Sequence, residues 1–268
     1  MKAARAVSFI LTFALMITAY GGRGVNGADM SVIRSDASDG TVCVCVGGMA
    51  DKQIRIGIEP VGVDKAYYLP VFKNESEIDV PLMFGNNAYN ICLYEEYSGK
   101  KYALLDSFKV NLKLDDYDKV YLASSVMVQW KGATAAIAKA GELVGAKKSE
   151  YDKFLSIYNY IVKNIAYDKE KYPDAGYRSS PDDTLLRGCG ICLDYAVLTA
   201  SMLRSQGVRC KLIYGNVSES DDLHSWNEVY IRGRWVIVDT TKDAQSYRSM
   251  TPYKYAKTKK DYIAKYTF

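Results

Sequence analysis

The sequence predicts an α+β protein with two domains. An all-β, sandwich-like domain at residues 29–130 is expected to precede a mixed α+β domain at residues 131–245. Short alternating or β-branched runs, separated by turn signals, fill the first region, and no helical pattern lies between them. In the second region helical patterns come first and strand patterns follow, which is typical of an α+β domain.

The runs of the first domain have the length and period of strands. Ile54, Ile56 and Ile58 alternate with polar Gln53 and Arg55, so one face of this run is expected to lie in a core. Strands at this spacing are typical of an antiparallel sandwich of roughly a hundred residues. The predicted strands are 41–48, 53–60, 66–72, 76–82, 88–97 and 102–114.

The second domain is expected to begin with two helices, at 132–148 and 149–168. The first is rich in alanine. The second has Ser149 in the N-cap position and Asp152 three residues later, a combination that satisfies exposed N–H groups at a helix start. A polar loop, 169–183, is predicted to follow.

A third helix and a sheet complete the predicted domain. Gly190 is a natural helix breaker, and an apolar helical pattern runs from Ile191 to Gly207, which suits the position just past a helix end. Two stretches, 208–217 and 224–241, read as strands, and the second contains a turn at Arg232-Gly233.

The last residues, 246–268, form a tail rich in lysine and tyrosine. Its segment 253–266 is predicted to be the solvated face of a terminal helix. Contact of these lysines with an anionic cell-wall polymer is the alternative.

Residues 1–28 have the order of a secretory signal peptide, because Lys2 and Arg5 precede an apolar run at 6–20 and a stretch of small residues. A membrane anchor is the alternative, but about 15 apolar residues are short for a span, which needs roughly 20. The chain is therefore expected to be secreted or held at the cell surface, and to meet a membrane only during export. Two cleavage positions fit, after Gly21 and after Ala28.

Net charge excludes nucleic acid as an expected partner. The formal charge of +4 comes from 35 basic and 31 acidic residues. Removal of residues 1–28 takes away three basic residues and no acidic ones, so the mature chain carries 32 against 31, or +1. A nearly neutral chain lacks the basic surface that phosphate backbones attract.

Six cysteines in an exported chain raise the question of disulfides. Cys43 and Cys45 lie on the same face of a predicted strand, where they suit a core. A bridge from one of them to Cys92 remains open at this stage.

His224 is the only histidine of the chain, and a carboxylate is predicted to lie beside it. A two-residue turn at Arg232-Gly233 would pair Trp226 with Asp239, and the same register places His224 and Asp239 as diagonal neighbours on one face, roughly 7–8 Å apart. Asp239 also interrupts an apolar run at an inward position, where a carboxylate needs a partner. The alternative role for Asp239 is to cap the turn at the end of its strand.

Cys192 is the candidate nucleophile. It falls in the first turn of the helix after Gly190, where unpaired N–H groups and the helix dipole favour a thiolate and can stabilise an oxyanion. Cys189 precedes the helix and gains less. A zinc site would need a second cysteine pair of similar spacing, and a thioredoxin-like redox pair would need a preceding strand, so both are weaker alternatives, as is a buried structural thiol. The order Cys192, His224, Asp239 suits acyl-transfer chemistry.

Four linked segments resemble the transglutaminase-like superfamily, specifically its exported bacterial members. The segment "GICLDYA" resembles the family's nucleophile motif with Cys192 in the reactive place, and "RSQGV" resembles its helix end. "HSWNEV" resembles the histidine segment and "WVIVDTT" the aspartate strand. The resemblance covers about 150–245, and it departs from the family at Cys189, where relatives commonly carry a basic residue.

This resemblance implies a papain-like core in which Cys192 forms a thioester with an amide or ester carbonyl, His224 transfers the proton and Asp239 orients the imidazole. Water as second substrate would give a peptidase or amidase, and a lysine amine would give a cross-link. The expected partner is a protein or peptide, including cell-wall peptide. No cofactor or metal is expected, because no acidic calcium loop of recognisable pattern is present.

Three points stay open in the sequence. A non-catalytic wall- or protein-binding module on the same fold is the main alternative to an enzyme, and a redox protein that uses Cys189 and Cys192 is the lesser one. The side chain that completes the oxyanion hole could be Tyr160, Tyr167 or Tyr177.

Overall fold

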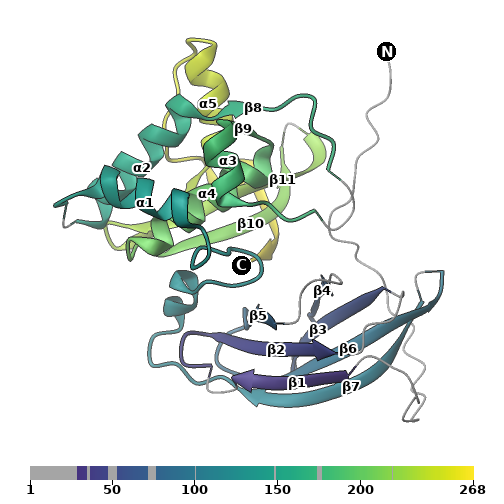
Figure 1. Ribbon diagram of the computed structural model, residues 1–268. Coiled ribbons are helices and arrows are strands. Elements are labelled where there is room, and N and C mark those ends of the chain that lie inside the picture. Colours follow the sequence, from purple (N-terminus) through teal and green to yellow (C-terminus); the bar gives the residue numbers. More distant parts are fainter. Residues whose placement is uncertain are drawn as a thin grey trace. The chain divides into compact units, whose positions relative to one another are not determined.

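The computed structural model divides the chain into two compact units, one that ends at Val120 and one that runs from Tyr121 to Phe268 (Figure 1). The expected signal peptide, residues 1–28, lies outside the described residues. The structure describes residues 29–34, 37–47, 53–71, 77–99, 101–147, 149–173, 177–218 and 220–268.

The first unit is all-β, as predicted. Its described strands form two antiparallel sheets, one in the order β1-β2-β5 and one in the order β4-β3-β6-β7. The strands are β1 (Asp29–Arg34), β2 (Thr41–Gly47), β3 (Ile54–Pro60), β4 (Tyr67–Val71), β5 (Glu77–Pro81), β6 (Ala88–Ser98) and β7 (Lys101–Asn111). All six predicted strands are present, and β1 is an additional one.

The period-2 pattern decides which residues of this unit are buried. Ile54, Ile56 and Ile58 of β3 are buried, as their alternation predicts. On the opposite face of β3, Gly57 is needed because a Cβ there would lie 2.7 Å from the ring of Tyr94 and 2.9 Å from that of Tyr68. The sheet that contains β3 therefore buries an apolar face by simple alternation along this strand.

The second unit has helices packed against one antiparallel sheet in the order β12-β11-β10-β13. Helix α4 contacts β10 and β11, and α1, α2 and α3 pack around it (Figure 1). The helices are α1 (Thr134–Val144), α2 (Glu150–Asn164), α3 (Pro181–Arg187), α4 (Cys192–Ser205) and α5 (Thr240–Arg248). The strands are β8 (Ala166–Tyr167), β9 (Cys189–Gly190), β10 (Cys210–Val217), β11 (Ser220–Ile231), β12 (Arg234–Val238) and β13 (Tyr262–Thr267), and the short 3₁₀ helices are η1 (Tyr117–Leu122) and η2 (Lys259–Asp261).

Helix α4 is the buried centre of this unit, and it begins and ends as predicted. Its C-terminus is closed by Gly207 at φ 75° and by two bonds, from Gly207 N to Arg204 O and from Val208 N to Leu203 O, each 3.0 Å. This is the Schellman arrangement. The guanidinium of Arg204 is buried and donates to the carbonyl groups of Ala123, Cys210 and Phe268, so the segment from Tyr121 belongs to this unit.

The predicted hairpin register is correct up to the end of β12. Ile231 pairs with Arg234 and Asn227 with Val238. The turn residues Arg232 and Gly233 both have positive φ, 53° and 75°, as a two-residue hairpin turn requires. The pairing does not reach residue 241, because Asp239 ends the strand and caps α5.

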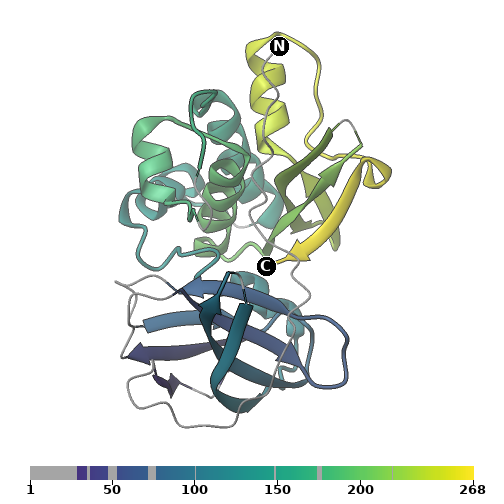
Figure 2. The same cartoon turned by 90° about the vertical axis from the view of Figure 1, so that its right-hand side faces the viewer.

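Three predictions about the second unit are wrong. Part of the polar loop at 169–183 belongs to α3, which has Ser180 as N-cap and Pro181 in its first turn. Thr240 and Thr241 are helical rather than extended. The tail ends in strand β13, the yellow arrow in Figure 2, and not in a helix, because residues 262–267 complete the backbone hydrogen bonds of β10.

The six cysteines all lie among the described residues and no disulfide joins any two of them, so neither Cys43 nor Cys45 is bridged to Cys92. Cys92 and Cys210 are buried and the others are half-buried. Within the part of the chain that the structure describes, no helix has the length and apolar character needed to span a membrane.

Candidate active site

Cys192 is the first residue of α4. The preceding residue, Ile191, is extended at φ −90° and ψ 178°, and its carbonyl accepts the first helical bond from Tyr195 N at 3.1 Å. The N–H groups of the first turn have no carbonyl partner within a helix, and the positive end of the helix dipole lies there. The thiol therefore stands where a negative charge is favoured and where N–H groups can bind an oxyanion.

His224 comes from β11, opposite Gly215 of β10. Its Nε2 lies 2.7 Å from Oδ2 of Asp239, and its ring stacks on Trp226 at 6.2 Å between centroids. A side chain at position 215 is excluded, because a Cβ there would lie 2.0 Å from the carbonyl oxygen of Ile263. The close approach of β13 thus depends on this glycine, and Trp226 and Asp239 fix the imidazole plane.

Asp239 is fully buried and uses both carboxylate oxygens. Oδ1 accepts from Lys242 N at 3.0 Å and so caps α5. Oδ2 accepts from His224 and also from the hydroxyl of Tyr262 at 3.0 Å. Asp239 is therefore the predicted imidazole partner, and in place of the predicted turn cap it is the N-cap of helix α5.

Electrostatics link the three predicted residues. Burial alone would lower the pKa of His224, but hydrogen bonds to Asp239 and Cys192 and the charges of both raise this pKa to about 10. Burial opposes ionisation of Asp239, yet the His224 imidazolium and the Lys242 and Tyr262 donors hold its pKa below the usual value. Since Nε2 faces Asp239, Nδ1 is the ring nitrogen that remains for Cys192. The structure thus brings Cys192, His224 and Asp239 together.

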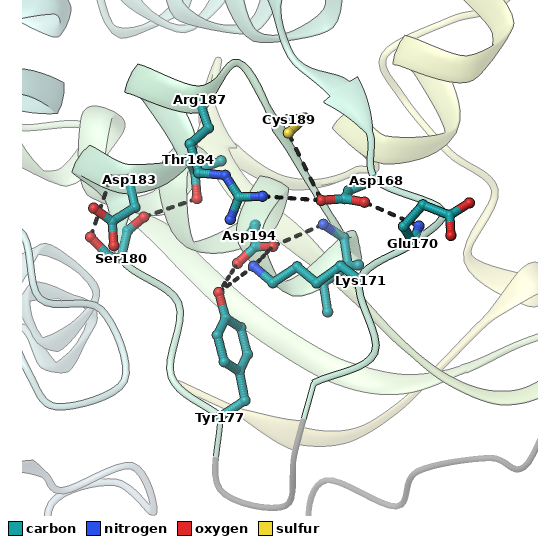
Figure 3. A network of polar contacts seen from close by, with 11 residues as sticks. Asp168, Glu170, Lys171, Tyr177, Ser180, Asp183, Thr184, Arg187, Cys189 and Asp194 are labelled. Atoms are coloured by element: carbon teal, nitrogen blue, oxygen red, sulfur yellow. Dashed lines mark hydrogen bonds and ion pairs between the residues drawn. The ribbon is translucent and has the colours of Figure 1, made fainter.

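A second buried carboxylate, Asp194, lies in the first turn of α4. It accepts from Ile191 N at 2.8 Å, from Lys171 Nζ at 2.7 Å and from the Tyr177 hydroxyl at 2.7 Å (Figure 3). Sequence reasoning did not single out Asp194. An acidic residue three places after an N-cap, inside the apolar run "CLDYAVLTA", was the available signal.

Cys189 contacts a different carboxylate from those around His224. It lies in β9, which pairs in parallel with β8, and its Sγ is 3.9 Å from Oδ2 of Asp168 (Figure 3). The two cysteines of the C-x-x-C segment therefore have different partners, Asp168 for Cys189 and His224 for Cys192.

The three tyrosines proposed for the oxyanion hole have different surroundings. The Tyr177 hydroxyl is engaged by Asp194, and the ring of Tyr160 lies 5.8 Å from the ammonium of Lys139. Tyr167, in β8, is close enough to Cys192 that burial, and next the charge of this cysteine, raise the pKa of its hydroxyl. Its hydroxyl therefore stays protonated at neutral pH and can donate.

Metal ligation has no support among the described residues, where no group of three or more His, Cys, Asp and Glu side chains could hold an ion. The chemistry available to the site is that of a thiolate, an imidazolium and a carboxylate in sequence.

Comparison with known proteins finds relatives of the α+β unit. Residues 137–240 match the transglutaminase-like superfamily. This match lies within the α+β unit and supports the resemblance of its segments to that superfamily.

Two curated relatives are each similar to about half of the chain. Kyphoscoliosis peptidase of Mus musculus is 28% identical over 148 residues, which are 51% of this chain and 22% of the relative. The Homo sapiens protein of the same name is 26% identical over 143 residues, 49% of this chain and 21% of the relative. The match therefore spans about a fifth of each relative's length.

Solved structures similar to the chain include two bacterial proteins. The periplasmic domain of TgpA from Pseudomonas aeruginosa is 15% identical, with a TM-score of 0.40, and the match covers 74% of this chain and 93% of that one. Calcium-bound LapG of Legionella pneumophila is 18% identical, with a TM-score of 0.39, and the match covers 51% of this chain and 75% of that one.

Proposed function

We propose that the chain is an exported thiol enzyme that acts on peptide or side-chain amide bonds through a thioester on Cys192. Its proposed catalytic residues are Cys192, His224 and Asp239. The observation that carries the proposal is the position of the sole imidazole, which has Asp239 at 2.7 Å on Nε2 and Cys192 as its other partner. The export signal at 1–28 supports a secreted or cell-surface location.

In the first step the Cys192 thiolate attacks the substrate carbonyl carbon, and a carbon–sulfur bond forms. The negative oxygen that results is stabilised by N–H groups at the start of α4 and by the hydroxyl of Tyr167. His224 donates its Nδ1 proton to the nitrogen of the leaving amine, the carbon–nitrogen bond breaks, and a thioester remains. Asp239 holds the ring in the required orientation throughout.

In the second step a nucleophile attacks the thioester, and the neutral His224 accepts its proton. Water gives a carboxylic acid and regenerates the thiolate–imidazolium pair, which is peptidase or amidase chemistry. A lysine amine gives an isopeptide bond. We favour hydrolysis, with a protein or peptide substrate that includes cell-wall peptide. The runner-up is a wall- or protein-binding module that keeps the fold without turnover.

Mass spectrometry of a peptide mixture incubated with the protein, with and without an amine donor, tests this proposal. New peptide ends would identify hydrolysis, and donor adducts would identify transfer. Cys192→Ala should abolish both products and any acyl adduct on the intact protein, whereas the matched variant Cys189→Ala should retain them. Absence of products and adducts in the unaltered protein would support the binding module, and equal dependence on both cysteines would support redox chemistry.

A further inference from the structure

Asp194 presents an electrostatic problem for the proposed nucleophile. Its side chain is 0% exposed, and it follows Cys192 by two residues in the same first turn of α4. A carboxylate two residues from a thiolate in the same helical turn disfavours the second negative charge, since like charges in a buried place repel. The helix dipole that helps Cys192 is also partly neutralised by an acidic group at this position.

The molecule supplies a cation against this carboxylate. Lys171 Nζ lies 2.7 Å from Oδ2 of Asp194, and the lysine side chain is 19% exposed. Burial opposes the charge of Lys171, but its hydrogen bonds to Asp194 and Tyr177 raise its pKa, so the ammonium persists. The same ammonium lies 4.3 Å from the centre of the Tyr177 ring.

Packing and hydrogen bonds hold the Asp194 carboxylate in this position. A Cβ on Gly190 would lie 2.5 Å from Cβ and 2.8 Å from Oδ2 of Asp194, so the Asp194 side chain packs directly on the backbone of this glycine. Oδ2 also accepts from Ile191 N, the residue directly before the nucleophile. Lys171 and Tyr177 both come from the loop between β8 and α3, and they reach Asp194 together (Figure 3).

We infer that Lys171 is a positioning residue that cancels the charge of Asp194 and thereby permits a thiolate at Cys192. Tyr177 assists by binding the other carboxylate oxygen. The inference rests on the proposed thioester function, and it adds a residue from outside the Cys192–His224–Asp239 group. Through Lys171, the loop between β8 and α3 therefore influences the reactivity of Cys192.

Other charged or titratable groups around the thiol do not replace this cation. His224 faces Cys192 from β11, Tyr167 from β8 and Tyr214 from β10. Arg178, Asp168 and Asp222 act on these tyrosines from the surrounding loops and the start of β11. The positive charge of His224 is already paired with Asp239, so neutralisation of the negative charge on Asp194 depends on Lys171.

The test is the pH dependence of Cys192 alkylation by iodoacetamide, followed by peptide mass spectrometry, with circular dichroism to confirm folding. Lys171→Met leaves Asp194 uncompensated and should move the alkylation midpoint to higher pH by roughly one unit. Asp194→Asn leaves Lys171 uncompensated and should move the midpoint to lower pH by a similar amount. The double variant Lys171→Met/Asp194→Asn and the conservative Lys171→Arg should both return close to the unaltered protein.

A structural role alone predicts a different pattern. It would slow alkylation in both single variants without opposite shifts, and the double variant would be the slowest; that result overturns the inference. If Lys171→Met does not fold, Asp194→Asn decides, because an unchanged or higher midpoint refutes charge cancellation. Failure of the proposed function is distinct: the unaltered protein would then show no preferential alkylation of Cys192 over Cys189 at neutral pH.

Discussion

Two buried carboxylates, Asp194 and Asp239, have matching surroundings. Each is 0% exposed and accepts a backbone N–H at the start of a helix, from Ile191 for α4 and from Lys242 for α5. Each also accepts from a tyrosine hydroxyl, which is Tyr177 in the first case and Tyr262 in the second. Each has one cationic side chain within 2.7 Å.

The cation is what differs. Asp194 holds the ammonium of Lys171, which keeps its proton under ordinary conditions, so this pair can only neutralise and position. Asp239 holds an imidazole, which can release a proton from its other nitrogen while the carboxylate keeps its orientation. The same arrangement of contacts thus holds a fixed ion pair at Asp194, whereas at Asp239 it holds an imidazole that can release a proton.

The largest expected effect on activity comes from substitution of Asp239. Asp239→Asn should reduce kcat/KM by about 10²–10⁴-fold, because the amide no longer stabilises the imidazolium or fixes its tautomer. Asparagine still caps a helix, so the stability lost should be that of the His224–Asp239 pair and not that of the α5 cap. Asp239→Ala is the matched control, and it should lose about a further 1 kcal/mol of stability through the missing cap. Retention of full activity by Asp239→Asn would contradict the proposed role.

The stability of the His224–Asp239 pair should depend on pH in a defined direction. A raised imidazole pKa in the folded state stabilises the fold fully below the unfolded value of about 6.5, and this stabilisation is lost as pH rises through the folded value. Urea unfolding of Cys192→Ala, in which no thiolate takes part, should therefore show a stability that declines above pH 6.5. Adding Asp239→Asn should remove most of this slope, and an unchanged slope would argue against the pair.

A substitution at Gly190 should disrupt the contacts of Asp194 by steric overlap. Gly190→Ala should cost about 1–3 kcal/mol of unfolding free energy, because its Cβ would overlap Asp194 and displace the carboxylate from Ile191. Gly141→Ala is the control: this glycine lies inside α1 with nothing within 4 Å of the added carbon, and the change should stabilise by up to about 1 kcal/mol. Equal effects in chemical denaturation would refute the steric argument.

The smallest effects should come from the two tyrosines, and they sharpen the comparison. Tyr262→Phe and Tyr177→Phe each remove one bond to a buried carboxylate and should each cost about 1 kcal/mol of stability. Only Tyr262→Phe removes a donor from the carboxylate that orients His224, so it should show the larger loss of kcat with KM unchanged. If Tyr177→Phe reduced kcat more, the roles assigned to the two carboxylates would have to be exchanged.

Local sequence signals predicted much of the proposed site. The helix break at Gly190 placed Cys192 in a first turn, and the parity of the hairpin around Arg232-Gly233 placed His224 and Asp239 on one face. Both inferences use short-range geometry, because residues close together in the sequence determine where the helix begins and how the hairpin strands pair.

The features that were not predicted from the sequence depend on long-range contacts. Strand β13 forms because residues far along the chain complete the edge of β10, and its lysines gave the appearance of a solvated helix. Lys171 and Tyr177 lie in a polar loop, and nothing local indicates that both reach Asp194. Helix α5 was hidden because Asp239 serves its cap and the imidazole at once.

Proton NMR of the imidazole tests the central claim most directly, because His224 is the only histidine and a chain without a histidine tag gives one titrating ring. The ion pair predicts that His224 remains protonated through neutral pH and titrates with a pKa of about 10, and that Cys192→Ala lowers this value. Titration of the unaltered protein near 6.5, the ordinary value for a histidine, would contradict it.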